Sequence, residues 1–161
     1  GTTVEVKNTD AEGRIVMMDA IALAVEEGVD AIIDIATLTG AALMALGQLT
    51  APVLGNDQRV VDLTLAASAV TGEPLWQLPL ERKYRPQLDS DVADLANIGG
   101  RYAGATTAAL FLDHFTRKTP WAHLDIAGTM AVDADESWRS KGATGFGARL
   151  LLETALTLTN A

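Results

Sequence analysis

A short apolar run, Ala31 to Ala36, constrains the fold of this chain more than any other feature. Only Asp34 interrupts it, and nearly continuous runs of this kind are typical of central strands in sheets that helices cover on both faces. The preceding stretch, Ile15 to Val25, has its apolar residues at helical spacing and ends at Gly28, a residue common at helix C-termini. This order predicts an α/β fold with a mixed central sheet flanked by helices on both faces.

The elements around this strand are expected to alternate in the same way. Apolar residues lie nearly all round Ile15 to Val25, so we expect that helix to be largely buried. After the strand, the turn from Thr37 to Gly40 opens a second helix, with Thr39 as the expected N-cap. Such turns are where open α/β sheets bind ligands, although an ordinary capped loop has the same pattern. Further strands are expected over 52–54 and 121–126, and further helices over 60–70, 105–115 and 147–158.

Two kinds of loop segment are expected to be structural. Pro74 to Pro86 holds three of the five prolines and predicts a loop, with Trp76 and Tyr84 as packing residues. The glycine-rich segments 97–104 and 142–147 lack the spacing of a P-loop or of a dinucleotide fingerprint, so we do not expect nucleotide binding.

Composition argues against several functional classes. The 161 residues include 21 acidic and 12 basic side chains, a net charge of −9 with no basic cluster, so no nucleic-acid partner is expected. No apolar run reaches the roughly 18 to 20 residues of a membrane span, so no membrane partner is expected either. Cysteine is absent, which removes disulfides and thiolate chemistry and is compatible with a reducing compartment.

The segment from Asn8 to Arg14 places two carboxylates, Asp10 and Glu12, two residues apart and an arginine two residues later. One interpretation is structural, because Thr9-x-x-Glu12 fits a capping box at a helix start. The other is a metal site, because carboxylate oxygens are suitable ligands for Mg²⁺, Mn²⁺ or Zn²⁺. Arg14 would then supply a fixed positive charge for a developing oxyanion. The pattern alone leaves both interpretations open.

Asn8 to Arg14, with the sequence Asn-Thr-Asp-Ala-Glu-Gly-Arg, closely resembles the signature of the leucine (cytosol) aminopeptidases, which are two-metal exopeptidases. Three later segments, 36–41, 96–100 and 121–128, recur in that family in the same order, so the resemblance runs from near Val4 to about Leu151. It implies a metal-dependent hydrolase that releases N-terminal amino acids from peptides, with a leucine-type preference.

The resemblance also implies the metal and catalytic roles. Two divalent ions, Mn²⁺ or Zn²⁺, would be held in part by Asp10 and Glu12. Glu12 would bridge both ions, and Asp10 would bind one of them through its side chain and its backbone carbonyl. Arg14 would hold a bicarbonate-like anion that shuttles a proton, and would stabilise developing negative charge.

Substrate contacts follow from the same resemblance. The Leu38 carbonyl and the Gly40 N–H would contact the substrate backbone. Thr37, Ala127 and Met130 would line the pocket for the substrate side chain.

His123 and Asp125 are expected on one face of the strand over 121–126. A His-x-Asp pair could bind a metal. The family uses neither residue as a ligand, so we expect the aspartate to support a buried histidine instead. Asp34, in the earlier strand, is either paired or near the strand end.

Part of the family's site is absent from this sequence. The family supplies a further lysine and two aspartates as ligands, and a second, catalytic lysine, all upstream of the signature; Lys7 lies too close to the motif to replace either lysine. The chain also begins with Gly1 rather than Met. We therefore interpret residues 1–161 as the C-terminal part of the catalytic domain, without the ligand-bearing segment and N-terminal domain, and expect this fragment alone to be inactive. The resemblance further implies a cytoplasmic protein that forms a homo-oligomer, a hexamer.

Two other functions stay open. The chain could be a non-catalytic fragment or subunit kept for assembly. Gly1-Thr2-Thr3 could instead be the cut site of an N-terminal-threonine hydrolase, although Gly1 blocks the amine of Thr2 as the chain stands.

Overall fold

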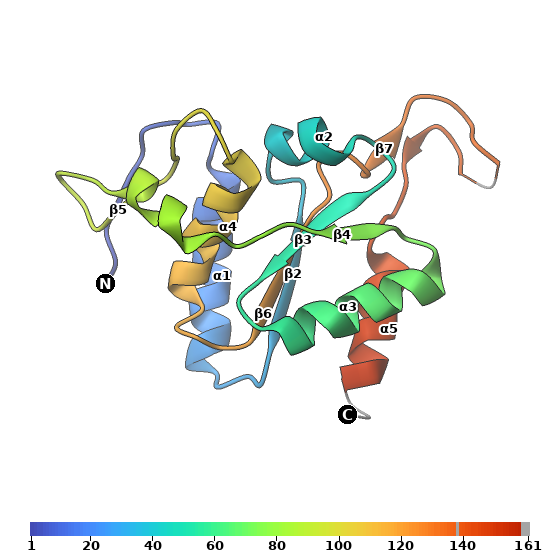
Figure 1. The fold of residues 1–161 in the computed structure, drawn as a ribbon, viewed down its shortest axis with the longest axis horizontal. Coiled ribbons are helices and arrows are strands. Elements are labelled where there is room, and N and C mark those ends of the chain that lie inside the picture. The colour runs from blue at the N-terminus through green and yellow to red at the C-terminus, as the bar shows by residue number, and fades with distance from the viewer. Residues whose placement is uncertain (138, 159–161) are drawn as a thin grey trace.

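A four-stranded sheet forms the centre of the computed structural model, which describes residues 1–137 and 139–158 (Figure 1). Its strands are β2 (Ile32–Ala36), β3 (Ala51–Gly55), β4 (Leu75–Gln77) and β6 (Trp121–Asp125). In the order β2-β6-β3-β4, the two outer pairs are parallel, whereas the central pair, β6 and β3, is antiparallel. The predicted mixed sheet is confirmed.

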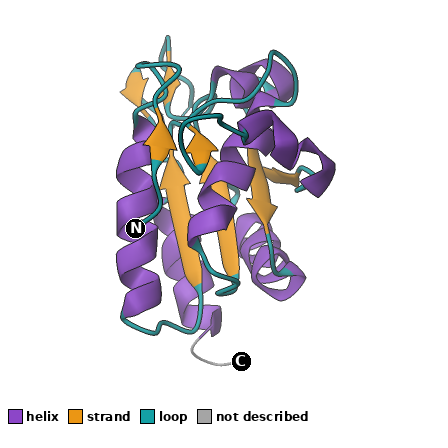
Figure 2. Cartoon of the chain, turned by 90° about the vertical axis from the view of Figure 1, so that its left-hand side faces the viewer, coloured by secondary structure: helices purple, strands orange, loops and turns teal. Residues whose placement is uncertain are grey.

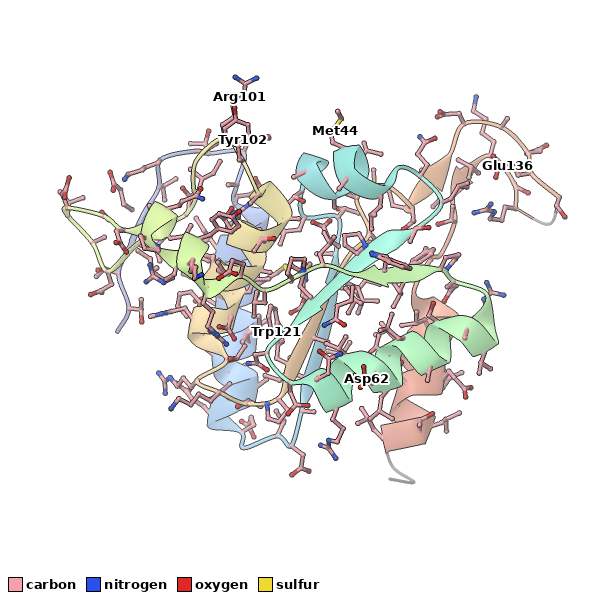
Figure 3. All side chains as sticks on the ribbon, in the orientation of Figure 1. Met44, Asp62, Arg101, Tyr102, Trp121 and Glu136 are labelled. Carbon is pink, nitrogen blue, oxygen red and sulfur yellow. The ribbon has the colours of Figure 1, made fainter. Side chains whose placement is uncertain are left out.

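Helices cover both faces of this sheet, as predicted (Figure 1). Helices α1 (Gly13–Glu26) and α4 (Gly104–Phe115) pack on one face, and α3 (Gln58–Thr71) and α5 (Ala148–Leu158) pack on the other. Side chains alternate between the two faces of a strand. Trp121 of β6 accordingly lies in the interior with α1 and α4 (Figure 3), whereas Leu124 packs with α3 and α5.

Two expectations about burial are wrong for the described residues. Strand β2, expected in the centre of the sheet, lies at its edge, pairs with β6 alone and is only half-buried. Helix α1, expected to be largely buried, exposes Val16 at 69% and Leu23 at 60%. The apolar pattern is present in both elements, but no element of the described chain covers that side of the helix or that edge of the strand.

The segment from Pro74 to Pro86 is not the loop that its prolines predict. Strand β4 fits between two of these prolines, and the 3₁₀ helix η1 (Arg82–Leu88) includes the third. Trp76 is 65% exposed and Tyr84 is also exposed, so neither is a packing residue. Proline is tolerated here because β4 is a short strand at the edge of the sheet.

The segments that resemble a functional site lie at one end of the sheet (Figures 1 and 2). These are the loop before α1, the turn between β2 and α2 (Gly40–Leu46), and the segment after β6. Two small ladders flank them: β1 (Val4–Glu5) pairs with β5 (Leu95–Ala96), and β7 (Ala131–Val132) pairs with β8 (Gly142–Ala143). Within the described residues, no helix combines the length and apolar content that crossing a membrane requires.

Candidate metal and substrate site

The signature loop leaves its two carboxylates without a structural partner. Helix α1 begins at Gly13, Glu12 is its N-cap residue, and no side chain caps this end, so the capping-box interpretation with Thr9 is wrong. Asn8 organises the loop instead, because its Oδ1 accepts a hydrogen bond of 2.8 Å from the Asp10 N–H. Asp10 and Glu12 are exposed, and neither takes part in an ion pair among the described residues. Both carboxylates are therefore available to bind a cation.

Arg14 is a buried cation that lacks hydrogen-bond acceptors. Its side chain is only 5% exposed, and within the described chain its Nε and Nη1 atoms have no hydrogen-bond partner. Burial lowers the pKa of the Arg14 guanidinium, and the negative charge of Asp125 opposes that shift. An arginine nevertheless keeps its charge at neutral pH. Buried donors without acceptors are costly, which indicates that this side chain is held for an anionic group.

One cavity of about 340 Å³ brings together residues from three segments. Asp10 and Arg14 come from the signature, Leu38 and Gly40 from the turn after β2, and Arg101 from the loop before α4 (Figure 3). Four predicted site residues thus share a cavity. The other four are not among its lining residues: Glu12, Thr37, Ala127 and Met130.

Asp125, at the end of β6, holds the turn between β2 and α2 in place. Its Oδ1 accepts hydrogen bonds from the Leu38 N–H (3.0 Å) and the Thr39 N–H (3.2 Å), and its Oδ2 accepts one of 2.6 Å from the Thr39 hydroxyl. Thr39 in turn accepts from the Ala42 N–H, which confirms it as the N-cap of α2. Sequence reasoning missed this role of Asp125, for which its place at the carboxyl end of a buried strand was the available signal.

The same carboxylate connects the turn to the segment after β6. The Ala127 N–H donates to Asp125 Oδ1 at 3.3 Å, and Met130 lies just beyond, with its side chain largely exposed. Gly128 packs directly against the end of α2, because a side chain at this position would come within 2.1 Å of the Gly47 carbonyl oxygen. The same set of contacts therefore positions two segments: the one that contains Ala127 and Met130, and the turn that contains Thr37.

The buried histidine is supported by a different aspartate from the one expected. His123 Nδ1 bonds to Asp34 Oδ1, and the Trp121 indole N–H donates to Asp34 Oδ2 at 2.6 Å. The parallel register explains this pairing, because it sets Asp34 opposite His123. Expecting a histidine with carboxylate support was correct, but assigning that support to Asp125 was wrong.

In the described structure, the segment of Thr2 and Thr3 has no hydrogen bond that pairs a threonine hydroxyl, as nucleophile, with a base of the kind that an N-terminal-threonine hydrolase uses. The Thr3 N–H and hydroxyl both donate to Asp94 Oδ2, at 2.8 and 2.7 Å, which fastens this segment beside β5. Thr2 is exposed, and no hydrogen bond of the described residues involves its hydroxyl. The N-terminal-threonine hydrolase therefore stays an untested prediction that no contact favours.

The donor set fits part of a metal site. Asp10 and Glu12 provide two free carboxylates of the type that Mn²⁺ and Zn²⁺ bind, beside a buried cation suited to an anion. The described residues contain no cluster of three or more histidine, cysteine, aspartate or glutamate side chains that could hold a metal ion. Two carboxylates cannot complete the coordination of two ions.

Comparison with known proteins gives matches along most of the chain. Residues 1–152 match the family described as cytosol aminopeptidase family, catalytic domain. A probable cytosol aminopeptidase of Synechococcus sp. (strain JA-3-3Ab) is 50% identical over 156 residues, which are 97% of this chain and 31% of the relative. One from Geobacter sulfurreducens is 52% identical over 153 residues, which are 95% of this chain and 31% of the relative.

The chain belongs to the cytosol aminopeptidase family, as its motifs predicted. The match of residues 1–152 is to the catalytic domain of this family of metallo-exopeptidases. It spans about a third of the length of these curated relatives.

Replacing Asp125 with asparagine should loosen the turn between β2 and α2. A hydrogen bond to an ionised acceptor contributes about 1.5–3 kcal/mol, against about 0.5–1.5 kcal/mol for a neutral one. We expect Asp125→Asn to lower the free energy of unfolding by about 1–3 kcal/mol and to speed amide exchange at Leu38 and Thr39. Urea unfolding and hydrogen–deuterium exchange measure the two effects.

Asp57→Asn is the matched control. Asp57 caps α3 through a 3.1 Å bond from the Val60 N–H, away from this turn. The control should leave the exchange of Leu38 and Thr39 unchanged. Equal exchange rates at those two amides in all three proteins would show that Asp125 does not hold the turn.

Proposed function

We propose that this chain is the C-terminal part of the catalytic domain of a metal-dependent aminopeptidase, which releases N-terminal residues, leucine among them, from peptides. One observation carries the proposal: two unpaired carboxylates, Asp10 and Glu12, precede a buried arginine whose Nε and Nη1 lack acceptors. An acidic pair without such an arginine would be an ordinary feature of a protein surface. A buried guanidinium close by in the sequence, with two donor atoms that have no acceptor among the described residues, supports a site for cations and an anion together.

The predicted metal and catalytic residues each have a proposed task. Asp10 and Glu12 would hold two divalent ions, Mn²⁺ or Zn²⁺, together with ligands from outside this chain. When bound, such ions activate water and polarise a carbonyl group. Arg14 would hold a bicarbonate-like anion and stabilise the negative charge that develops on the substrate.

The turn after β2 would bind the peptide. The Leu38 carbonyl accepts no hydrogen bond from the described residues and would accept one from the substrate backbone, while the exposed Gly40 N–H would donate one. Thr37, Ala127 and Met130 would bound the side-chain pocket. Support for this arrangement comes from Asp125, whose carboxylate connects the Thr37 turn with Ala127.

We propose that the remaining ligands lie upstream of Gly1 in the complete protein. The incomplete donor set, the uncovered side of α1 and the unpaired edge of β2 all support a missing neighbour. The relatives extend well beyond the matched third, which gives such a neighbour ample length. A homo-oligomer, a hexamer, and a cytoplasmic location remain proposals drawn from the family, whose members are named cytosol aminopeptidases.

Removing either carboxylate should abolish metal-dependent activity of the complete protein. We expect Asp10→Asn and Glu12→Gln each to reduce Mn²⁺-dependent release of leucine from leucyl amide by more than about 100-fold, the upper end for the loss of supporting groups around a metal. Asp19→Asn and Glu26→Gln alter exposed carboxylates on α1, the helix that follows this loop, and should keep full activity. Full activity of Asp10→Asn and Glu12→Gln would contradict the proposed ligands.

The 161-residue chain alone should release no leucine. Its two carboxylates leave the coordination of two ions incomplete, so added Mn²⁺ or Zn²⁺ should not restore activity. The measurement is the same leucyl amide assay, with the complete protein as the positive control. Turnover by the chain alone would contradict the division of the site between two segments. An inactive complete protein that still assembles would favour the non-catalytic alternative.

Arg14→Met should separate catalysis from metal binding. Methionine preserves most of the buried volume but removes the charge, and the loss of one donor to a developing oxyanion costs about 100- to 1000-fold in kcat. We expect that loss in the complete protein with Mn²⁺ content unchanged, as measured by atomic absorption. A wild-type kcat would show that the buried guanidinium serves folding alone.

A further inference from the structure

Asn97 is fully buried, and it uses its whole amide group on the signature loop. Its Oδ1 accepts hydrogen bonds from the Lys7 N–H (2.9 Å) and the Asn8 N–H (3.2 Å). Its Nδ2 donates to the Asn8 carbonyl (2.6 Å) and the Ala11 carbonyl (3.2 Å). One side chain, 86 to 90 residues away in sequence, thus holds the loop on both sides of Asp10.

Among the described residues, these bonds leave the Asp10 carbonyl without a partner. The Asn8 carbonyl accepts from the Ala11 N–H as well as from Asn97, and the Glu12 carbonyl accepts from the first turn of α1. The Asp10 N–H is occupied by Asn8 Oδ1. No hydrogen bond among the described residues ends on the Asp10 carbonyl oxygen. Asn97 therefore fixes the peptide groups around Asp10 while the carbonyl of Asp10 stays open.

The residue that holds the loop is itself held firmly. Asn97 follows β5, which pairs in parallel with β1, and its own N–H donates to the Glu5 carbonyl at 2.9 Å. The Thr3 hydroxyl bonds to Asp94, and Ser90 bonds to the Glu5 carboxylate, on either side of that ladder. Loop and support therefore form a connected network, in which Asn97 is the only polar side chain that contacts both flanks of Asp10 in the described structure.

We propose that Asn97 is the positioning residue of the metal site: it sets the backbone of Lys7 to Ala11 so that Asp10 meets a divalent ion in one fixed arrangement. This inference rests on the proposed function. Aspartate has the same shape but cannot donate to the two carbonyls, and its charge would repel them. If Asn97 positions the loop, its amide group is required. If Asn97 only fills space in the core, any side chain of the same shape is sufficient.

The test compares Asn97→Asp with Asn56→Asp in the complete protein. Asn56 is a matched control, because its Nδ2 donates to Asp113, Thr116 and Thr119 and its Oδ1 accepts from the Trp121 N–H. Both substitutions remove Nδ2 donors from a network between loops, but only Asn97 touches the signature. Free Mn²⁺, measured by electron paramagnetic resonance during titration, reports metal affinity without any assay of activity.

We expect Asn97→Asp to weaken Mn²⁺ binding by about 10- to 100-fold, as for other groups that orient metal ligands, and Asn56→Asp to leave it unchanged while lowering the melting temperature. Equal Mn²⁺ affinity in wild type and Asn97→Asp would overturn the inference and leave the proposed function intact. A wild-type protein that binds no Mn²⁺ would overturn both.

A second measurement keeps the test decisive if Asn97→Asp does not fold. In metal-free wild type, the Lys7 and Asn8 amides should exchange slowly, because Asn97 already accepts from them. Rapid exchange of both amides without metal, with protection on adding Mn²⁺, would mean that the ion orders the loop and would overturn the role of Asn97.

Discussion

The parallel pairing of β2 with β6 is the constraint on which the candidate site depends. In its register Asp34 opposes His123, and Ala36 opposes Asp125. Asp125 thereby reaches the turn after β2, and its carboxylate accepts the Leu38 N–H from 87 residues away. A slip of one residue would turn the side chains of one strand to the opposite face and break both pairings. The position of the turn after β2 therefore depends on the register of these two strands.

The burial of Arg14 can be explained only together with the position of Asp125. A guanidinium with buried donors and no acceptor costs free energy, because the donors lose water and gain nothing. The negative charge of Asp125 offsets part of that cost through space, since it raises the pKa that burial lowers. The remaining cost fits the proposed role, in which the charge is oriented before an anion arrives and no reorganisation is needed.

Some local signals in the sequence predicted local structure, whereas the capping box of Thr9 and Glu12 did not. Thr39 caps α2 as expected, because side-chain capping acts within a few residues. The motif from Asn8 to Arg14 predicted Asp10 and Arg14 as site residues, and in the structure both line one cavity. The supports of that cavity escaped prediction, because Asp125 and Asn97 find their partners some 86 to 90 residues away and carry no spacing signal.

The apolar patterns of α1 and β2 predicted more burial than these elements have in the described chain. Periodicity reports what an element buries in the complete protein, whereas the observed exposure concerns only the described chain. Both elements are apolar enough for an interior, yet α1 has an uncovered side and β2 an unpaired edge. Long apolar edges are normally paired or covered, because they otherwise promote aggregation.

Three features of the described chain support the proposed neighbour: the incomplete set of proposed metal ligands at Asp10 and Glu12, the unpaired edge of β2 and the exposed apolar side of α1. The described residues of one chain contain no cluster of three or more side chains that could hold a metal ion, so a second copy would bring no complete metal site of its own. A preceding segment of the same polypeptide would meet all three needs at once. The curated relatives extend well beyond the stretch that this chain matches, which supports the proposed segment.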